Sequence, residues 1–441
     1  MPNGRMRVTD RKASRRAEAE RGEAASAPAP IRRLFEETRS RSLALVEGLS
    51  PEDMVVQSME DASPAKWHLA HATWFFEQFV LIPLAPGYRP HDERFLHCFN
   101  SYYVQVGSRH ARPRRGLLTR PTADEVIAYR HGVDDAVAGF LASDADGEAF
   151  GRVELGCHHE MQHQELLLTD LLHAFSFNPL APAYRAPEPL PVRPAPEGEP
   201  EPVAFAGGVV EVGHAGGGFA FDNEGPRHAV LLRPFRLAAR PVTNREWLAF
   251  MSDGGYDAET LWLSDGWAER MRQDWQAPLY WTMRDGEPWS FGLRGLQPVD
   301  LDAPVAHVSY FEADAFARWA GRRLPSEHEW EHAAAAARSG EEGGFLEGRF
   351  LRPRPVGGGD GLSGMQGEVW QWTQSAYGPY PGFRPAVGAL GEYNGKFMVS
   401  QWVLRGASCL TPRASARRTY RNFFHPHQRW QVAGLRLAED A

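Results

Sequence analysis

The segment HHEMQHQELLL, from His158 to Leu168, decides how the first part of this chain folds. It belongs to a longer stretch, residues 151–175, in which apolar side chains recur at intervals of three and four and predict an amphipathic helix. His159 and His163 are four residues apart, so at 3.6 residues per turn they lie about 40° apart on one face of this helix. Two imidazoles in this arrangement can bind one metal ion. The segment therefore predicts a long helix that carries part of a metal site.

Three further stretches show the same helical periodicity. They are residues 31–49, 63–81 and 122–142. Ser63 before Pro64 is a typical helix start, and Thr122 with Glu125 forms a capping box. Together the four stretches predict an up-and-down helical bundle over residues 31–184, and the core of such a bundle is where these proteins place metals.

A third ligand is available in WHLAH, residues 67–71, which offers His68 or His71. Helical geometry alone leaves the choice between these two open. His158 points about 100° away from its neighbour His159, so it faces another side of the helix. Three neutral imidazoles suit Zn(II), Fe(II) or Cu, and the pattern predicts a metal without deciding which.

The composition changes after the predicted bundle. Residues 185–202 alternate proline with charge, which predicts a linker without regular structure. Residues 203–441 hold twelve of the 14 tryptophans and abundant glycine, which predicts a loop-rich α+β domain with few helices. Those helices are expected at residues 243–251, 310–321 and 326–337. At the other end, residues 1–30 are rich in Arg, Ala and Glu and predict a disordered tail.

Bulk composition narrows the possible classes of protein. A length of 441 residues predicts two domains, and a net charge of −8 gives no reason to expect nucleic acid or an anionic membrane as partner. Three cysteines without a CxxC pair argue against a disulfide framework and favour a reducing, cytoplasmic location. No apolar run approaches the roughly 20 residues that span a bilayer. The oligomeric state stays open.

Two irregular stretches carry chemically active side chains. In FNSYYVQVGSRHARP, Tyr102 and Tyr103 are adjacent phenols, and Arg109 and Arg112 together could clamp a carboxylate. The alternative is a solvated basic loop beside a packed aromatic pair. Near the C-terminus, Asn422 and Gln428 are possible ligand contacts, although amides more often satisfy the backbone of their own loop.

A set of motifs from both halves, in order from Ile31 to Ala438, carries a family resemblance. These motifs are WHLAH, FNSYY, RHARP, HHEMQHQEL, VTNREWLAF, HVSYFEADAFARWAGRRLPSEHEWE, GEVWQWTQS, VLRGAS and RNFFHPHQRWQVAGLRLA. The chain resembles the sulfoxide synthases of ergothioneine biosynthesis. The resemblance implies a two-domain α+β fold, in which a DinB-like four-helix bundle precedes a formylglycine-generating-enzyme-like, C-type-lectin-like domain.

The resemblance also implies a reaction and its metal. Members are mononuclear non-haem Fe(II) enzymes that use O2 to join a thiol sulfur to the imidazole of hercynine (Nα-trimethylhistidine), leaving a sulfoxide. By motif, the second histidine of WHLAH is the ligand, so His71 rather than His68 completes the set with His159 and His163. The implied small-molecule partners are hercynine, a thiol and O2.

Substrate contacts follow from the resemblance in the same way. Gln162 and Asn422 match positions that contact hercynine, and Phe423 lies in the same RNFF motif. Arg109 and Arg112 match the pair that anchors the carboxylate of the thiol substrate.

Departures from the family pattern point to one branch. Where the branch that uses γ-glutamylcysteine has an acidic residue and an arginine, this chain has Phe424 and Gln428, and where that branch has a catalytic tyrosine it has Leu390. FNSYY is typical of the branch that uses free cysteine. We therefore expect cysteine as the thiol donor, with Tyr102 and Tyr103 as proton donor and as the hydrogen bond that directs sulfoxide formation.

Several other functions remain possible. A selenium-transferring relative that makes selenoneine would have the same fold and ligands. An ovothiol-type synthase would join histidine with cysteine, but such chains usually add a methyltransferase domain for which a chain ending at Ala441 leaves no room. Formylglycine generation would need a cysteine pair in the second domain, where only Cys409 is available. A DinB-type metal-dependent thiol transferase would need no O2, and a lectin-like domain could act as a binding module alone.

Overall fold

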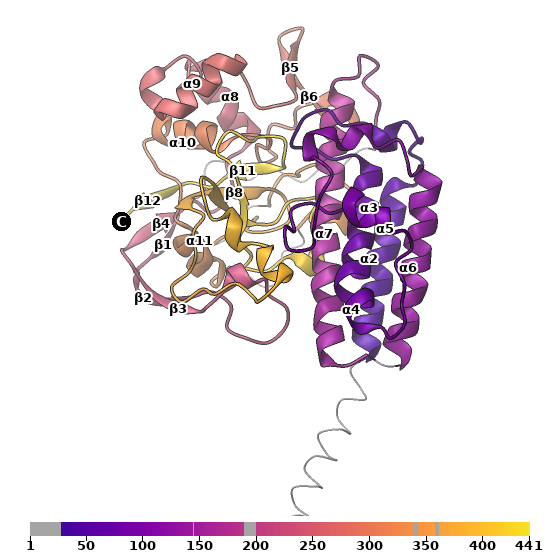
Figure 1. The fold of residues 1–441 in the computed structure, drawn as a ribbon. Coiled ribbons are helices and arrows are strands. Elements are labelled where there is room, and N and C mark those ends of the chain that lie inside the picture. Colours follow the sequence, from indigo (N-terminus) through magenta and orange to yellow (C-terminus); the bar gives the residue numbers. More distant parts are fainter. Residues whose placement is uncertain (1–27, 144, 189–199, 338–342, 358–360) are drawn as a thin grey trace, which may run out of the picture.

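The computed structural model describes residues 28–143, 145–188, 200–337, 343–357 and 361–441. The predicted two-domain α+β architecture is confirmed: a helical bundle is followed by a domain of short sheets and loops (Figure 1). Of the tail predicted at residues 1–30, the first 27 lie outside the described residues, and residues 28–30 already belong to the first helix. The central part of the predicted linker, residues 189–199, also lies outside them.

Four long helices form the bundle. They are α2 (Pro28–Val46), α3 (Ala65–Phe76), α6 (Ala123–Ser143) and α7 (Gly147–Ser176). α7 packs against α2 and α3, and α3 also packs against α6 (Figure 1). The capping box predicted at the start of α6 is confirmed, because the Thr122 N–H donates to the Glu125 carboxylate and the Glu125 N–H donates to the Thr122 hydroxyl. None of the helices in the described ranges combines the length and apolar character that crossing a bilayer requires.

The helix cap predicted at Ser63 is wrong. α3 begins at Ala65 after Pro64, and the Ser63 side chain caps no helical N–H group. Instead the Ser63 hydroxyl accepts a hydrogen bond from Arg115, and the Ser63 N–H donates to Asp170 at 2.8 Å. The residue ties the start of α3 to the adjoining loop and to α7.

A glycine allows α3 and α7 to approach closely. A Cβ atom added at Gly156 of α7 would lie 2.5 Å from Cε1 of Phe76 at the end of α3. A side chain at this position would therefore push the two helices apart. This contact holds the two segments with the histidine motifs against each other.

Short helices occupy the remaining turns of the bundle domain. α3 continues through a π-helical turn (Glu77–Leu81) into α4 (Ile82–Leu84), and the connection to α6 contains α5 (Glu93–Cys98) and a 3₁₀ helix (Arg112–Leu117). The stretch with FNSYY and RHARP lies in this irregular connection. Another 3₁₀ turn (Asp53–Val55) precedes α3.

The second domain consists of small sheets joined by long loops. The described residues form one four-stranded sheet of order β10-β9-β8-β11, in which β11 is parallel to β8 and the other neighbours are antiparallel. Its strands are β8 (Trp370–Ala376), β9 (Trp402–Gly406), β10 (Asn422–Phe424) and β11 (Ala433–Leu435). The smaller sheets comprise β1 (Val203–Phe205), β4 (Phe235–Leu237) and β12 (Ala438–Asp440); β2 (Gly208–Val212) and β3 (His228–Leu232); and β5 (Trp281–Arg284), β6 (Glu287–Gly292) and β7 (Gly295–Pro298).

Helices of this domain are short. They are α8 (Asn244–Ser252), α9 (Ser264–Gln273), α10 (Tyr310–Trp319) and α11 (Glu327–Ala334), with 3₁₀ turns at Asp222–Glu224, Glu259–Leu261, Leu346–Gly348, Ala389–Glu392, Gly395–Phe397 and Arg413–Ser415. The sequence predicts α8, α10 and α11 and misses α9, because few of the side chains of α9 are buried.

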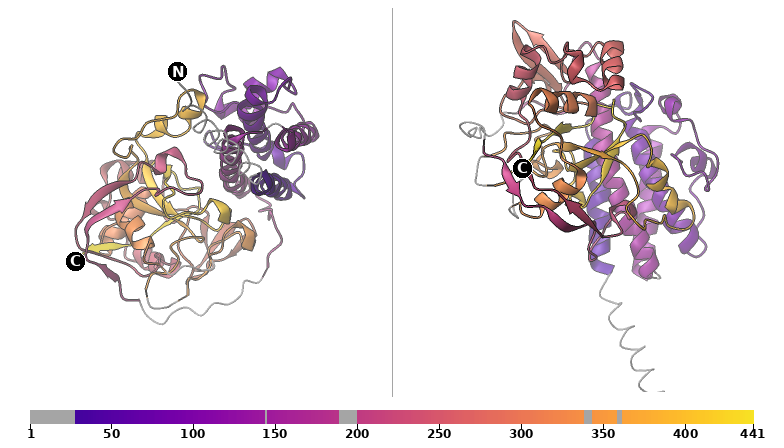
Figure 2. Two further views of the ribbon diagram at one scale, coloured as in Figure 1. Left: turned by 90° about the horizontal axis from the view of Figure 1, so that it is seen from below. Right: turned by 90° about the vertical axis from the view of Figure 1, so that its left-hand side faces the viewer.

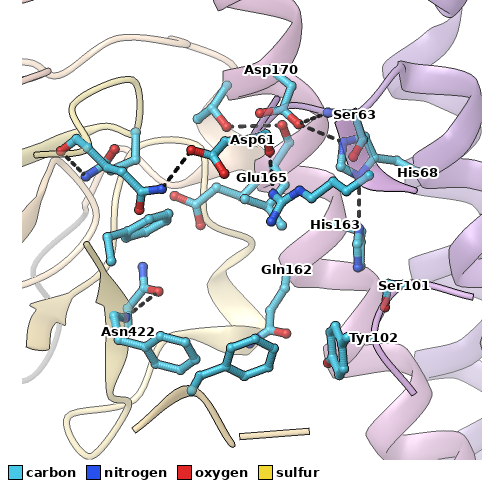
Figure 3. Close-up of a pocket in the computed structure, with 18 of the residues that line it drawn as sticks. Asp61, Ser63, His68, Ser101, Tyr102, Gln162, His163, Glu165, Asp170 and Asn422 are labelled. Carbon is cyan, nitrogen blue, oxygen red and sulfur yellow. Dashed lines mark hydrogen bonds and ion pairs between the residues drawn. The ribbon is translucent and has the colours of Figure 1, made fainter. Parts of the chain in front are cut away.

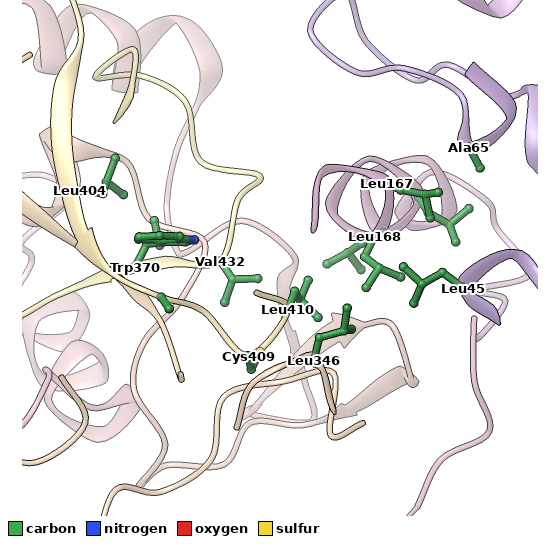
Figure 4. Close-up of a cluster of buried hydrophobic side chains, with 14 of the residues drawn as sticks. Leu45, Ala65, Leu167, Leu168, Leu346, Trp370, Leu404, Cys409, Leu410 and Val432 are labelled. Carbon is green, nitrogen blue, oxygen red and sulfur yellow. The ribbon is translucent and has the colours of Figure 1, made fainter. Parts of the chain in front are cut away.

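The two domains share one hydrophobic core. Figure 2 shows the bundle standing along one side of the second domain. Buried side chains of the bundle, such as Leu167 and Leu168 of α7, belong to the same apolar cluster as Leu410 and Val432 of the second domain (Figure 4). A polar contact reinforces this interface, since the Glu165 carboxylate accepts hydrogen bonds from the following second-domain groups. These are Trp370 Nε1 at 2.8 Å, Ser408 Oγ at 2.5 Å and Thr411 Oγ1 at 2.7 Å.

Candidate metal centre and substrate cavity

Three histidines from two adjacent helices meet at the edge of the bundle core. His71 of α3 lies beside His159 and His163 of α7, and one ring nitrogen from each lies within 4.8 Å of the other two. The Nε2 atoms of His71 and His159 are 3.2 Å apart. The HxxxH pair thus shares one face of α7, as its spacing predicts, and α3 adds the third imidazole.

The two histidines of WHLAH point in different directions. Nδ1 of His71 donates a hydrogen bond to the Phe99 carbonyl oxygen at 2.6 Å, which leaves Nε2 facing the cluster. The His71 ring also stacks on Trp67, with ring centroids 4.6 Å apart. His68 lies outside the cluster, and its Nδ1 lies 2.9 Å from Nδ1 of His163. The geometry therefore brings His71, not His68, together with the HxxxH pair.

Burial keeps these three imidazoles neutral at pH 7. It lowers the pKa of His159 to about 3, and it lowers the pKa values of His71 and His163 well below the ordinary value. Metal ligation requires the neutral ring, so no proton has to be displaced near pH 7. A cluster of three neutral nitrogen donors, with His71 and His159 buried and His163 partly buried, fits a divalent transition metal that keeps other coordination positions for substrates.

A cavity of about 730 Å³ opens beside the histidines, and both domains line it. The bundle domain contributes His163, Tyr102 and Gln162, and the second domain contributes β10 with Asn422. Figure 3 shows these four side chains arranged around the same space. The cavity therefore joins the candidate metal centre to most of the residues that the sequence singles out.

The two adjacent tyrosines have different environments. Tyr102 lines the cavity, whereas Tyr103 is fully buried and packs against Trp74 inside the bundle. Their phenol oxygens are 3.4 Å apart, and burial raises the pKa of both phenols. Leu390 is absent from the described residues that line the cavity. Tyr102 thus reaches the cavity directly, and Tyr103 stands behind it.

The second domain holds the loop that carries this tyrosine pair. The Glu392 carboxylate accepts hydrogen bonds from the N–H groups of Val104 at 3.0 Å and Gln105 at 2.9 Å. Lys396 donates to the Tyr102 carbonyl oxygen and pairs with Glu392 at 2.7 Å. The position of the Tyr102 phenol therefore depends on both domains.

The predicted arginine pair lines the cavity from an exposed loop. Arg109 donates to the Ser101 carbonyl oxygen at 3.2 Å, and Arg112 donates to the Asp61 carbonyl oxygen. Within the described part of the chain, neither guanidinium has an ion pair with a carboxylate. Three residues further on, Arg115 is buried, with its guanidinium carbon 3.4 Å from the centre of the Trp67 ring.

Side-chain amides lie on the opposite side of the cavity and on α7. Gln162 donates to the Tyr420 hydroxyl at 2.5 Å and accepts from the Tyr393 hydroxyl, so neighbouring phenols fix its orientation. Gln428 accepts from the His425 N–H at 3.0 Å and donates to the Asp61 carboxylate at 3.1 Å.

The residues of β10 face the cavity in a row. Asn422 accepts a hydrogen bond from the N–H of Phe423 at 2.9 Å. The Phe423 ring stacks on Tyr377 with centroids 4.0 Å apart, and Phe424 meets the edge of Trp430. All three β10 side chains line the cavity, so every substrate-binding position predicted from the sequence lies around one space.

Comparisons with known proteins agree with this architecture. The DinB superfamily matches residues 34–168, and the sulfatase-modifying factor enzyme 1-like domain matches residues 189–353 and 357–441. A hercynine oxygenase of Mycolicibacterium thermoresistibile is 36% identical, over 93% of this chain and 95% of the relative. A hercynine oxygenase of Mycobacterium tuberculosis is 35% identical, over 91% of this chain and 96% of the relative. This chain belongs to the hercynine oxygenase family.

The hercynine oxygenase resemblance that the motifs predict is thereby confirmed, across both domains. The match to Ergothioneine biosynthesis protein 1 of Schizosaccharomyces pombe is 27% identical and covers 50% of this chain and 28% of that protein.

The hercynine oxygenase cavity also contains groups that the sequence analysis missed. Arg115 continues the three-residue spacing of Arg109 and Arg112, and that spacing was a usable signal. Asp170 lies seven residues after His163, two turns along the same face of α7, so its position had a usable signal as well. Asp61 carries none, because it reaches Gln428 only through a tertiary contact.

The protein's own cysteines are poorly placed to act as reactive thiols in this hercynine oxygenase. Cys157 and Cys409 are buried, and burial raises the pKa of each thiol well above its ordinary value. Cys409 is the single cysteine of the second domain. The pair that formylglycine generation would need is therefore missing.

Proposed function

We propose that this chain catalyses the oxidative joining of the cysteine sulfur to the imidazole of hercynine at a mononuclear iron(II). The observation that carries the proposal is a neutral histidine triad beside a cavity that His159 and His163 line. The same cavity holds the Tyr102 phenol and the guanidinium groups of Arg109 and Arg112, which have no carboxylate partner among the described residues. The reaction balances without another reductant. One C–H and one S–H bond break, one C–S bond forms, and the two oxygen atoms of O2 end in the sulfoxide and in water.

His71, His159 and His163 would hold the iron. Three imidazole ligands leave coordination positions for both substrates and O2. Bound iron(II) would supply O2 activation and a common anchor for the two substrates. The protein's part is to bring the reacting atoms together in a fixed orientation.

Gln162, Asn422 and the aromatic side chains of the second domain would bind hercynine. Gln162 lies between the ligands His159 and His163 in the sequence, and two tyrosines fix its amide, so it is placed to orient the imidazole. Phe423 and Phe424 offer aromatic faces to the cavity. Such faces attract a trimethylammonium group, which has no N–H for a hydrogen bond.

Arg109, Arg112 and Asp61 would bind the amino-acid part of cysteine. The guanidinium groups match a carboxylate, and the Asp61 carboxylate matches a free ammonium group. In γ-glutamylcysteine that nitrogen is acylated and uncharged, so Asp61 favours free cysteine. Phe424 and Gln428 supply no charge that would hold a glutamyl group.

Tyr102 would donate the proton that the reaction requires at the metal side of the cavity. Burial raises its pKa, so the phenol keeps its proton at pH 7. Tyr103 stands 3.4 Å behind it and can support the same hydrogen bond.

Product analysis with three donors offered side by side tests the proposal. Purified protein with Fe(II), O2 and hercynine receives cysteine, γ-glutamylcysteine or a selenium donor. We expect hercynylcysteine sulfoxide from cysteine alone. Turnover with γ-glutamylcysteine but not cysteine would overturn the choice of donor, and turnover with the selenium donor alone would indicate selenoneine formation. Transfer of the thiol to an electrophilic acceptor without O2, with no product from hercynine, would indicate a thiol transferase.

A further inference from the structure

The three candidate ligands differ in what lies behind them. Nδ1 of His71 donates to a backbone carbonyl oxygen, whereas Nδ1 of His159 is buried with no hydrogen-bond partner among the described residues. Nδ1 of His163 lies 2.9 Å from Nδ1 of His68. On its far side, Nε2 of His68 lies 3.1 Å from Oδ2 of Asp170 (Figure 3). His163 alone among the three ligands therefore leads to a carboxylate.

One arrangement of protons satisfies this chain of contacts. If Nε2 of His163 faces a metal, its Nδ1 carries the hydrogen and donates to Nδ1 of His68. His68 then carries its hydrogen on Nε2 and donates to the Asp170 carboxylate. Each nitrogen has one partner and each hydrogen one acceptor. A ligating histidine backed in this way is fixed in tautomer and ring orientation, and its basicity is raised.

Asp170, the last residue in this series of contacts, is fixed by a further hydrogen bond and lies near a positive charge. Asp170 Oδ2 also accepts the Ser63 N–H at 2.8 Å, and the Ser63 hydroxyl accepts from Arg115 Nη1 at 2.9 Å. His68, Ser63, Asp170 and Arg115 are all buried. The Arg115 guanidinium, which donates to the same Ser63, places a positive charge near this buried carboxylate.

We propose that His68 and Asp170 form a positioning pair that orients His163 and strengthens it as a metal ligand. The pair gives the first histidine of WHLAH a role one step from the metal, while the second contacts it. This inference rests on the proposed function only for the presence of a metal at the triad.

Metal affinity and the ligand field of a Co(II) probe test the pair. The variants are Asp170→Asn, His68→Gln and both together, with Asp170→Glu as the conservative variant that keeps the charge. His158→Gln is the matched control, because it changes a buried histidine next to the triad that stacks on Phe219 and lies outside the chain of contacts.

We expect Asp170→Asn and His68→Gln each to weaken Co(II) binding by about 10- to 100-fold and to shift its visible bands. The double variant should bind Co(II) about as tightly as the more affected single variant, since both changes act through His163. Asp170→Glu should recover part of the affinity, and His158→Gln should bind Co(II) like the wild type. Circular dichroism identifies variants that fail to fold, in which case Asp170→Glu and His68→Gln decide.

If Asp170→Asn and His68→Gln leave the Co(II) affinity and the visible bands unchanged, the proposed positioning role is wrong. Additive losses of affinity in the double variant would also overturn it. An equal loss of Co(II) affinity in His158→Gln would also overturn it, because the loss would then reflect a general destabilisation of α7 around the triad. A wild-type protein that binds Co(II) at the triad and forms no sulfoxide with Fe(II) would overturn the proposed reaction and leave the pair standing.

Discussion

The two walls of the cavity differ in kind. The bundle wall carries groups that ionise or ligate: His159 and His163 of the triad, the arginine loop, Asp61 and Tyr102. The second-domain wall carries mainly amides and aromatic rings, and its Arg421 is already paired with Glu327 at 2.7 Å. On the proposed function, this difference places metal binding, proton donation and the charged contacts with the thiol in the bundle wall, and uncharged contacts with hercynine in the second-domain wall. Changes in the bundle wall should therefore have the larger effects, and a change in the opposite wall should only weaken hercynine binding.

The largest effect should come from removing a ligand. His159→Ala should abolish stoichiometric iron binding and with it sulfoxide formation, because two imidazoles cannot hold the metal as three do. Iron content after gel filtration and product analysis measure this. His158→Gln, one residue away, should keep its iron. One iron per chain in His159→Ala would contradict the ligand set.

The phenols should affect the product rather than the metal. Tyr102→Phe should lower sulfoxide formation by about 100- to 10,000-fold, the usual contribution of a positioned proton donor, and divert the reaction toward oxidation of the thiol. Tyr103→Phe should divert it less, since this phenol acts from behind. Chromatography of both products gives the product ratio, and the iron content shows whether the metal is retained. An unchanged product ratio in both variants would reject a role for the phenols.

A substitution at Asp61 should show whether the amino group of cysteine is recognised separately from its carboxylate. Asp61→Asn should raise KM for cysteine by about 10- to 100-fold, the value of a hydrogen bond to a charged group, and leave KM for hercynine unchanged. Arg112→Ala should raise the KM for cysteine and, to a similar extent, the inhibition constant of γ-glutamylcysteine as a competitor of cysteine. An equal rise of these two constants in Asp61→Asn would contradict ammonium recognition.

A smaller change is expected from the second-domain wall. Asn422→Ala should raise KM for hercynine by about fivefold, because a neutral hydrogen bond contributes about 1 kcal/mol. Initial rates at saturating cysteine measure the change. A fall in kcat with KM unchanged would show instead that this wall takes part in the chemistry.

The change with the smallest expected effect on activity lies where α7 meets the second domain, and it alters how stability depends on pH. His158 of α7 stacks on Phe219 with centroids 3.8 Å apart, and burial and the Arg417 charge lower its pKa to about 3. The unfolded chain takes up this proton near pH 6.5 and the folded chain only near pH 3. The free energy of unfolding of the metal-free protein should therefore fall as the pH drops below 6.5, by up to about 1.4 kcal/mol per unit from this group.

His158→Gln should make that slope shallower. Urea unfolding at pH 7, 6 and 5 compares the variant with the wild type. If the free energy of unfolding changes with pH equally in the variant and the wild type, the native His158 ring takes up its proton as readily as it does in the unfolded chain.

The bundle wall was the more predictable of the two. Helical spacing alone placed His159 and His163 on one face, since both lie on a single helix. The choice of His71 over His68 needed the resemblance, because it depends on how α3 rotates against α7. The same spacing places Asp170 on that face, but its contact with His68 of α3 does not follow from spacing. Asp61 could not be predicted, since its partner Gln428 is distant in the sequence. The contacts of Asn422 and Phe424 depend on loops whose course no periodicity describes.

Glu165 has a consequence for how substrates enter. It lies two residues from His163, and its three bonds to the second domain would be lost if the domains parted. Parting the domains would also expose the apolar core that they share, and this exposure costs about 25 cal/mol for each Å² of apolar surface. We therefore expect the two domains to stay together, so that substrates enter a cavity with both walls in place, beside the exposed Arg109 and Arg112 that line it.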